Sequence, residues 1–366
     1  HHSPTFPVLD RFGEHWPEGW SWRRGLPEAN STVGTVSVMG SGLPNRPNTT
    51  YLPQSRLAQI SFRTAPAAQF HAAGYETIFV YGGNTTWRKF DQFLPRQGFD
   101  RVEGLPAIHA ALGLGEEGQA FWKTYDENLF AYLHQILRDA KRPVFLVVLT
   151  ATNHPPFEWL ERFGLPTLTP PPELAGVLDS GAPTGRLKGI QYSCRELGRW
   201  MDRLETDGLL DRTLLAVTGD HNTLDYASYH DGEQLDRWGV PLWLRVPEAW
   251  KPALTPDFDA PAGHLDLVAT LMHLALPNRD WICLGSSLLD PERDARVMNE
   301  SGLALSPEGA IQENTFGLRA FAWEGAQARG LRTVPSSPNS EALRVWTRAR
   351  LAGVDHLIRM QQANRP

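Results

Sequence analysis

The sequence predicts an α/β protein with a mainly parallel central sheet flanked by helices and a smaller C-terminal α+β part. Three observations support this prediction. Apolar runs with the length of buried strands recur at 75–81, 143–150 and 213–218. Segments with helical spacing lie between these runs, as in parallel sheets whose strands are joined by crossover helices. Beyond residue 295 the pattern changes to further expected strands and a terminal helix at 339–362.

Length and composition limit the possible domains and partners. A chain of 366 residues can bury a large core, and we expect a main domain over 1–295 and a C-terminal extension over 296–366. The net charge of -6 argues against a nucleic-acid-binding protein. The two cysteines, Cys194 and Cys283, are too few for a disulfide framework, and either a pair or two separate thiols fits the sequence. No apolar run reaches the roughly 18–20 residues of a membrane helix.

The N-terminal part contains a cluster of hydroxyl groups. Residues 1–30 are expected to form an aromatic-rich loop with a short helical turn at 8–12. Ser31, Thr32 and Thr35 then begin a small-residue helix that ends near Gly42. A hydroxyl at the positive end of a helix dipole is placed where an alkoxide or a phosphate is favoured, but capping alone also accounts for each of these hydroxyls.

A second group of candidate residues follows the first strand. We expect a helix at 54–73, then the strand 75–81, then Gly82-Gly83. The loop beyond carries Trp87, Arg88 and Lys89, which form a plausible anion pocket. The alternative is a solvated helix start with a buried Trp.

His154 is the next candidate. A helix at 117–141 and the strand 143–150 lead into Asn153-His154-Pro155-Pro156. A histidine at the C-terminal end of a strand, fixed by two prolines, is a candidate site residue, whereas a lone histidine is more often a structural hydrogen-bonding group.

The strongest signal is the sequence Thr218-Gly219-Asp220-His221. It follows a helix at 188–206 and the strand 213–218, so a carboxylate and an imidazole stand where open α/β sheets keep their sites. This oxygen and nitrogen pair suits Mn²⁺, Zn²⁺ or Mg²⁺, although Asp220 could instead cap the following turn. A polar loop, a strand at 240–247 and a helix from residue 264 come next; the loop carries Asp225, Tyr226, Tyr229, His230 and Asp231.

Taken in order, these motifs resemble the sulfatase-type branch of the alkaline phosphatase superfamily, over about residues 4–290. Within that branch the chain is similar to the lipoteichoic acid synthase and phosphoglycerol transferase group. The motifs that carry the resemblance are Thr32-Val33-Gly34, Gly42-Leu43-Pro44, Tyr81-Gly82-Gly83, Gln97-Gly98-Phe99-Asp100, Asn153-His154-Pro155-Pro156-Phe157, Tyr192, Thr218-Gly219-Asp220-His221, Val240-Pro241-Leu242 and His264-Leu265-Asp266.

The resemblance implies an alkaline-phosphatase-like fold and a metal-dependent phosphotransferase. A Thr nucleophile would take phosphoglycerol from a phosphatidylglycerol-like lipid and pass it to a glycan or polyglycerolphosphate acceptor. One divalent cation is implied, Mn²⁺ first, with Mg²⁺ or Zn²⁺ as alternatives. The domain would lie outside the cytoplasm, in the periplasm or at the cell surface, anchored by membrane helices upstream of His1.

Residue by residue, the resemblance assigns Thr32, Asp220 and His221 to the metal. Thr32 is also the implied nucleophile, preferred to Thr35 because its spacing to Leu43-Pro44 matches the group and Thr-Val-Gly resembles Thr-Ile-Gly. His154 is the implied substrate-side histidine. The expected substrate-binding residues are Trp87, Arg88, Lys89 and His230.

Two departures from the family pattern bear on function. The family's metal-binding Glu ends a first strand that would lie upstream of Ser3, and the chain shows no such strand. The group's Trp-Asn-Arg element is replaced by Trp87-Arg88-Lys89. Another phosphodiesterase or a phosphoethanolamine transferase therefore remains an alternative, as does a catalytically inactive binding or sensor domain. A sulfatase proper is disfavoured, because no Cys-x-Pro-Ser-Arg segment is present.

Overall fold

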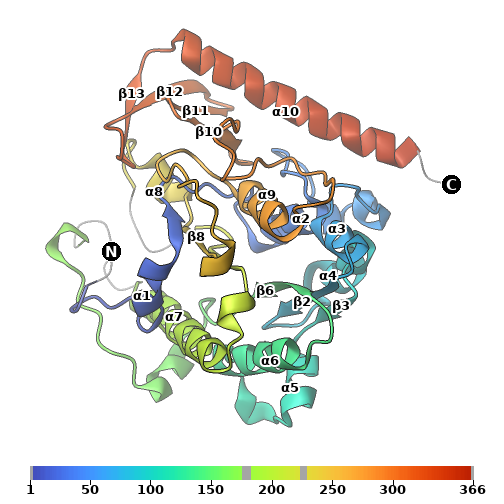
Figure 1. Cartoon of the computed structure of the whole chain (residues 1–366). Helices are drawn as coiled ribbons and strands as arrows, with labels where there is room; N and C mark the ends of the chain where they lie inside the picture. The colour runs from blue at the N-terminus through green and yellow to red at the C-terminus, as the bar shows by residue number, and fades with distance from the viewer. Residues whose placement is uncertain (1–2, 175–182, 223–228, 364–366) are drawn as a thin grey trace.

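The computed structural model describes residues 3–174, 183–222 and 229–363 (Figure 1). Its centre contains a parallel sheet of three strands in the order β3-β2-β6. Six residue pairs join β2 to β6 in parallel register, from Glu76 opposite Val144 to Tyr81 opposite Leu149. The loops that follow these two strands therefore leave from the same edge of the sheet. The strands are β2 (Glu76–Tyr81), β3 (Arg101–Glu103) and β6 (Val144–Leu149).

A second three-stranded sheet is antiparallel throughout. Its order is β1-β8-β7, with Trp20 opposite Leu244 and Thr218 opposite Leu242. The prediction of a mainly parallel sheet therefore holds for β3, β2 and β6, whereas β7 and β8 pair in opposite directions. The strands are β1 (Trp20–Trp22), β7 (Leu215–Thr218) and β8 (Leu242–Arg245).

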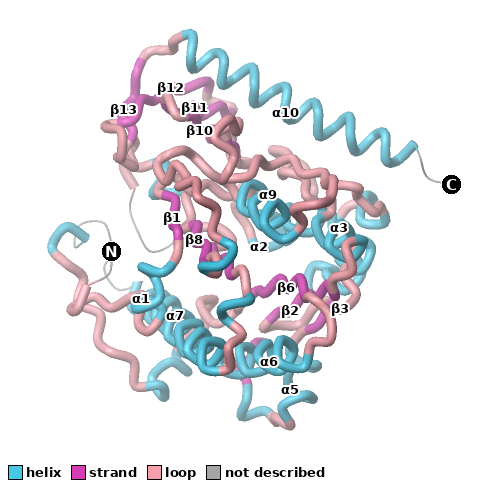
Figure 2. Tube along the Cα trace, viewed as in Figure 1, coloured by secondary structure: helices cyan, strands magenta, loops and turns pink. Residues whose placement is uncertain are grey.

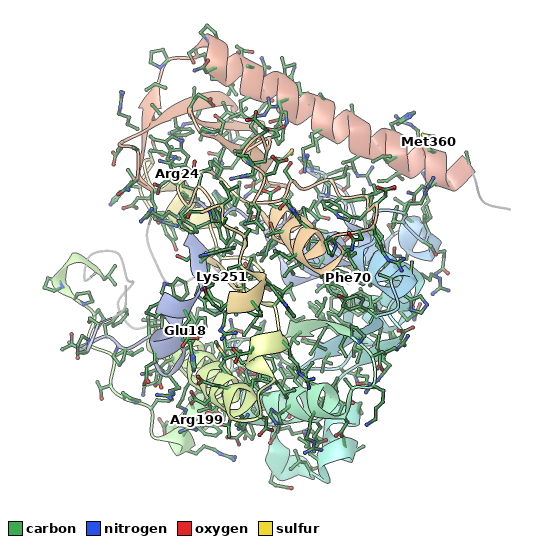
Figure 3. All side chains as sticks on the ribbon, viewed as in Figure 1. Glu18, Arg24, Phe70, Arg199, Lys251 and Met360 are labelled. Carbon is green, nitrogen blue, oxygen red and sulfur yellow. The ribbon has the colours of Figure 1, made fainter. Side chains whose placement is uncertain are left out.

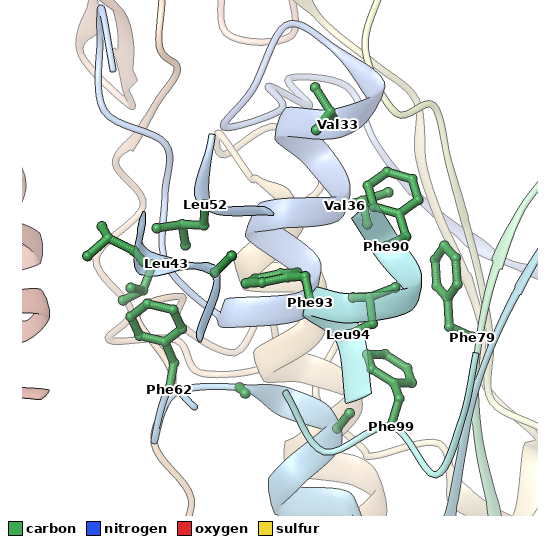
Figure 4. Close-up of a cluster of buried hydrophobic side chains, with 14 of the residues drawn as sticks. Val33, Val36, Leu43, Leu52, Phe62, Phe79, Phe90, Phe93, Leu94 and Phe99 are labelled. Carbon is green, nitrogen blue, oxygen red and sulfur yellow. The ribbon is translucent and has the colours of Figure 1, made fainter. Parts of the chain in front are cut away.

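Helices cover both faces of the parallel sheet, as the secondary-structure view also shows (Figure 2). Ile78 and Val80 face one side and pack with α6 and α7, while Phe79 faces the other side, where α2 and α4 lie (Figure 4). Alternation with both faces buried is expected for a central parallel strand. The helices are α1 (Phe12–His15), α2 (Thr32–Ser41), α3 (Pro66–Ala72), α4 (Phe90–Phe93), α5 (Leu105–Leu112), α6 (Asp126–Asp139), α7 (Pro183–Thr206), α8 (Gln234–Trp238) and α9 (His264–Ala275).

The C-terminal part forms an antiparallel sheet in the order β13-β12-β11-β10-β9, followed by the long helix α10. Arg24 attaches this sheet to the N-terminal segment: its guanidinium lies 3.8 Å over the ring of Trp323 and donates to the carbonyls of Gly325, Ala326 and Ala328 (Figure 3). The elements are β9 (Val297–Met298), β10 (Leu303–Ser306), β11 (Gly309–Asn314), β12 (Gly317–Trp323), β13 (Leu331–Val334) and α10 (Pro338–Ala363).

Two predicted helices are wrong in extent. The segment 54–73 begins at the last residue of one 3-10 turn (Leu52–Gln54), contains a second (Arg56–Gln59) and only then α3. Helix α3 begins at Pro66, because a proline keeps the preceding residue, here Ala65 with a ψ of 118°, out of the helical conformation. The segment 117–141 is helical only from Asp126. Before it, β4 (Gln119–Ala120) and β5 (Lys123–Thr124) form a hairpin whose tip residue Phe121 has a φ of 58°.

The other predicted elements are present, with shifts at their ends. Helix α2 ends at Ser41 and is capped by Gly42, whose φ of 71° is a left-handed conformation that favours glycine. The expected turn at 8–12 is α1, three to four residues later, and the strand β1 was not predicted within the aromatic loop. The described residues contain no helix that is both long and apolar enough to cross a membrane.

Candidate active site

Thr32, Asp220 and His221 come together at one point. Thr32 begins α2, and its hydroxyl donates a 2.6 Å hydrogen bond to Oδ2 of Asp220. Nε2 of His221 lies 3.4 Å from the same hydroxyl oxygen and 3.5 Å from the Asp220 carboxylate. Three residues that the sequence assigned to one metal site therefore share a common centre.

The neighbouring hydroxyl groups of Ser31 and Thr35 make other hydrogen bonds. Ser31 is the cap of α2, since its Oγ accepts from the backbone N–H of Gly34 at 3.2 Å. Thr35 donates to the backbone carbonyl of Asp220 at 2.6 Å, which fixes the main chain that carries the carboxylate. The Thr32 hydroxyl is therefore not needed for capping and points to Asp220.

The orientation of His221 follows from its other ring nitrogen. Nδ1 lies 2.8 Å from the carbonyl oxygen of Asn222, so Nδ1–H is the donor and Nε2 carries the lone pair. That lone pair faces Thr32 and Asp220. Asn222 is itself held by Tyr229, Asp236 and Arg237, to which its side-chain amide donates.

A buried histidine supports the Gly219-Asp220 turn from behind. Nε2–H of His264 donates to the carbonyl of Gly219 at 2.9 Å. Burial lowers the pKa of His264 to about 4, so the ring is neutral near pH 7. His264 begins α9, and the buried carboxylate of Glu28 accepts from the backbone N–H groups of His264 and Leu265 at 3.0 Å each. Glu28 thereby connects the segment before Thr32 to the helix that holds the Asp220 turn.

The chemistry of the converging donors fits a divalent cation. A carboxylate, a hydroxyl oxygen and an unprotonated imidazole nitrogen are ligands for Mn²⁺, Mg²⁺ or Zn²⁺. Over the described ranges, no group of three or more His, Cys, Asp or Glu side chains is arranged to hold a metal ion. Asp220 and His221 therefore depend on the Thr32 oxygen for a third donor from this part of the chain.

Tyr81 is close enough to Asp220 to be influenced by its charge, and the sequence analysis did not name it as a site residue. It ends β2, and burial, together with the charge of Asp220, raises the pKa of its phenol. A Cβ on Gly83 would stand 2.7 Å from the Tyr81 ring, which is why a glycine follows at this point. The Tyr81-Gly82-Gly83 motif was the sequence signal that could have identified this residue.

His154 follows β6 at the same sheet edge. Its ring is exposed, packs edge-to-face on Trp122 with 5.3 Å between ring centres, and its Nδ1–H donates to the Pro155 carbonyl. Lys123 is fully buried beneath it and donates to the backbone carbonyls of His154 and Pro156. Both Lys123 and Trp122 belong to the hairpin that the sequence had placed in a helix.

Trp87, Arg88 and Lys89 follow β2. The three residues form a 3-10 turn that leads into α4, so the segment is a helix start. Trp87 packs on Phe90 and Tyr81 but is 40% exposed, so the expected burial of this Trp is not found. Arg88 and Lys89 have φ values of 55° and 63°, a left-handed backbone that is uncommon for non-glycine residues and often occurs at functional sites. Both side chains are exposed. They are thus available to an anionic ligand.

His230 is not brought to the centre by any contact of the described residues. It is exposed, and its backbone N–H donates to Glu233 at 2.7 Å, next to the start of α8. Two other residues of the predicted polar loop, Asp225 and Tyr226, lie outside the described residues.

Comparison with known proteins identifies the family of the chain. The sulfatase family profile matches residues 1–276. Lipoteichoic acid synthase 1 of Bacillus subtilis (strain 168) is 22% identical over 266 residues, which cover 69% of this chain and 39% of that protein. The chain therefore spans about two-fifths of the length of that relative.

Solved structures share the fold at low sequence identity. The lipoteichoic acid synthase LtaP from Listeria monocytogenes aligns with a TM-score of 0.79 at 14% identity, covering 96% of this chain and 86% of that one. The phosphoglycerol transferase GacH of Streptococcus pyogenes, in complex with sn-glycerol-1-phosphate, aligns with a TM-score of 0.52 at 12% identity (74% and 68%). The C-terminal periplasmic domain of EcEptC from Escherichia coli, in complex with Zn, aligns at 0.52 and 15% identity (81% and 84%).

The family assignment rests on the profile match, which covers most of the chain, and the Thr32–Asp220–His221 centre lies within the matched residues. The chain belongs to the sulfatase family, in the alkaline phosphatase superfamily, and is similar there to lipoteichoic acid synthases and to the phosphoglycerol transferase GacH.

Proposed function

We propose that this protein is a metal-dependent phosphoglycerol transferase with Thr32 as its nucleophile. The observation that carries the proposal is the 2.6 Å bond from the Thr32 hydroxyl to Asp220, with the lone pair of His221 facing the same oxygen. The similarity to GacH, whose structure contains sn-glycerol-1-phosphate, supports phosphoglycerol as the transferred group.

Thr32, Asp220 and His221 are the residues that would hold the cation, Mn²⁺ in the first place and Mg²⁺ or Zn²⁺ otherwise. When bound, such a cation stabilises a Thr alkoxide near pH 7 and neutralises phosphoryl oxygens. The zinc complex of EcEptC supports a divalent metal in this fold. The helix dipole of α2 adds only about 0.3–1 kcal/mol for negative charge at its first residue, so most of the activation of Thr32 would have to come from a bound cation.

The chain's own residues then carry out a two-step transfer. In the first step Oγ of Thr32 forms a bond to phosphorus and its proton passes to the Asp220 carboxylate that already accepts it, while the bond from phosphorus to the lipid alcohol breaks and His154 gives a proton to the departing alkoxide. In the second step an acceptor hydroxyl attacks phosphorus and its proton passes to His154, while the bond from phosphorus to Thr32 breaks and Oγ takes its proton back from Asp220. Each step forms one P–O bond and breaks one.

The cations after β2 are proposed to hold the phosphodiester. Arg88 and Lys89 are exposed, have left-handed backbones and follow a strand whose partner β6 leads to His154. A guanidinium and an ammonium at the rim provide the charge that a phosphodiester requires. Trp87 would pack against the uncharged part of the headgroup, and His230 is the further substrate-binding residue that the resemblance implies.

The chain spans 39% of the length of lipoteichoic acid synthase 1, so the donor and the acceptor of the transferred group are also proposed here. We expect a phosphatidylglycerol-like lipid as donor and a glycan or polyglycerolphosphate chain as acceptor. We propose that the domain acts outside the cytoplasm, the location that the family resemblance implies. The EcEptC domain, which shares the fold, is periplasmic, and this supports the proposed location.

Covalent labelling tests the proposal. The protein is incubated with Mn²⁺ and phosphatidylglycerol that carries a labelled headgroup, and the modified peptide is mapped by mass spectrometry. Label on Thr32, lost in Thr32→Ala and retained in Thr49→Ala, is the expected result; Thr49 is an exposed threonine on the loop after α2. Label on Thr35 would reject Thr32 as the nucleophile. Stoichiometric metal without any label or glycerol release would reject phosphoglycerol transfer from this donor, and an empty metal site would favour a binding domain.

A further inference from the structure

A carboxylate from the C-terminal sheet reaches the segments around Thr32. Glu300 lies in the turn between β9 and β10, and its Oε1 accepts from the backbone N–H of Asn30 at 2.7 Å and from the Tyr51 hydroxyl at 3.0 Å. Asn30 stands two positions before Thr32 in the chain. The C-terminal sheet, which the sequence treated as a separate extension, thus contributes directly to the surroundings of the site.

The turn that carries Glu300 is fixed in place. Asn299 is fully buried, and its Oδ1 accepts from the backbone N–H groups of Ser301 and Leu303 and from the Ser301 hydroxyl. Its amide donates to Oδ1 of Asn30 at 3.2 Å. Glu300 is therefore a positioned group whose orientation is set by neighbours on both sides.

Charges around Glu300 connect it to the catalytic centre. Burial raises the pKa of Glu300, and the bonds from Asn30 and Tyr51 and the charge of His221 act in the opposite direction. The pKa of Tyr51 is likewise raised by burial, and the charge of Arg88 acts to lower it. Glu300 is thus within electrostatic reach of a proposed metal ligand and of the surroundings of a proposed phosphate ligand.

The second carboxylate oxygen, Oε2, receives no hydrogen bond from the described residues. Glu300 is partly buried, but this oxygen is not among the buried atoms, so it is open to solvent and can accept a hydrogen bond from a ligand in place of water. A phosphoryl group is not that ligand, because two anions repel. An ammonium group is disfavoured, because the guanidinium of Arg88 and a bound cation would make the surroundings positive. A neutral hydroxyl is the donor that fits.

We propose that Glu300 is a specificity-determining residue whose Oε2 accepts a hydrogen bond from a hydroxyl of the polyol attached to phosphorus. This inference rests on the proposed function, and it defines the transferred group as a phosphorylated alcohol that carries a further hydroxyl. A phosphate ester of a plain alkyl group would lack the contact and bind more weakly.

Binding measurements with small phosphates test this without turnover. Affinities for sn-glycerol-1-phosphate, methyl phosphate and ethanolamine phosphate are measured calorimetrically in the presence of Mn²⁺. The wild-type protein should prefer glycerol phosphate to methyl phosphate, and Glu300→Ala should lose about 10- to 100-fold of that preference, as expected for a hydrogen bond to a charged group. Glu300→Gln should retain most of the preference, since its amide oxygen can also accept. Glu308→Ala, an exposed glutamate between β10 and β11, is the matched control.

Each other outcome overturns the inference. Equal losses for glycerol phosphate and methyl phosphate in Glu300→Ala would indicate a merely structural role. A large loss of Mn²⁺ affinity would make Glu300 a metal ligand. Tighter binding of ethanolamine phosphate than of glycerol phosphate by the wild-type protein would assign the oxygen to an ammonium group. Equal binding of the first two ligands by the wild-type protein, or binding of neither, also contradicts it. Because these assays need no covalent step, their result is independent of whether Thr32 is labelled.

Discussion

The Thr32 hydroxyl donates a 2.6 Å hydrogen bond to the carboxylate of Asp220, 188 positions further along the chain. The bond joins the first residue of α2 to the turn after β7. A single hydrogen bond to a charged group is worth only about 1.5–3 kcal/mol net, so it does not by itself bring the two elements together. Packing of the surrounding core does so, and the two side chains are placed by it in the geometry that a cation would use.

Replacing Thr35 by Val should separate its role from that of Thr32. The substitution removes the donor to the Asp220 carbonyl while keeping the shape of the side chain. We expect the free energy of unfolding to fall by about 1–3 kcal/mol, the cost of a buried carbonyl without a partner, while covalent labelling still occurs at Thr32. Denaturant titration and peptide mapping measure both effects. Complete loss of labelling with unchanged stability would contradict this division of roles.

Asp220→Ala should abolish binding of the cation with little effect on the sheet. The carboxylate is one of three converging donors, and loss of even an outer partner of a metal ligand lowers affinity about 10- to 100-fold, so loss of a ligand should cost more than about 100-fold. Mn²⁺ content by elemental analysis and a calorimetric titration measure this. The control is Asp211→Asn, an exposed aspartate in the 3-10 turn before β7. Full Mn²⁺ occupancy in the Ala variant would show that the assignment is wrong.

Lys123→Met should disturb the turn that carries His154. The buried ammonium donates to the carbonyls of His154 and Pro156, and a methionine of similar length leaves both without this donor. We expect a loss of about 2 kcal/mol in unfolding free energy and a lower kcat, with Mn²⁺ affinity unchanged. Lys141→Met, at an exposed lysine before β6, should change none of these quantities. An unchanged kcat in Lys123→Met would show that this lysine does not orient His154 for catalysis.

His264 should make stability depend on pH. Burial lowers its pKa from 6.5 to about 4, so protonation favours the unfolded chain. The stabilising contribution is fully present above pH 6.5 and is lost as the pH falls through 4, a change on the order of 3 kcal/mol. His264→Gln keeps a donor for the Gly219 carbonyl but cannot titrate, so its stability should decrease less than that of the wild type over this range. Parallel curves from chemical denaturation at pH 7, 5.5 and 4 would refute this linkage.

Local patterns in the sequence predicted the elements on which the site is built. The apolar runs became β2, β6 and β7. Strand β2 is buried on both faces, as a continuously apolar run predicts, whereas β6 and β7 are only partly buried. The hydroxyl cluster predicted the start of α2, and Asp220-His221 stood out because two polar groups end a buried run. The assignment of Thr32 over Thr35 came from the spacing of a family resemblance, and no local property of the residues would have given it.

The sequence by itself determined which residues stand at the strand ends and at the start of α2. Only the tertiary structure decided which of them meet. It paired β7 antiparallel with β8, placed Lys123 under His154, and brought Glu300 from the C-terminal sheet to Asn30. These contacts join segments far apart in the chain. Hydrophobic periodicity describes how one element faces the core, but it contains no information on which distant element will cover that face, because that choice is made by the packing of the whole chain.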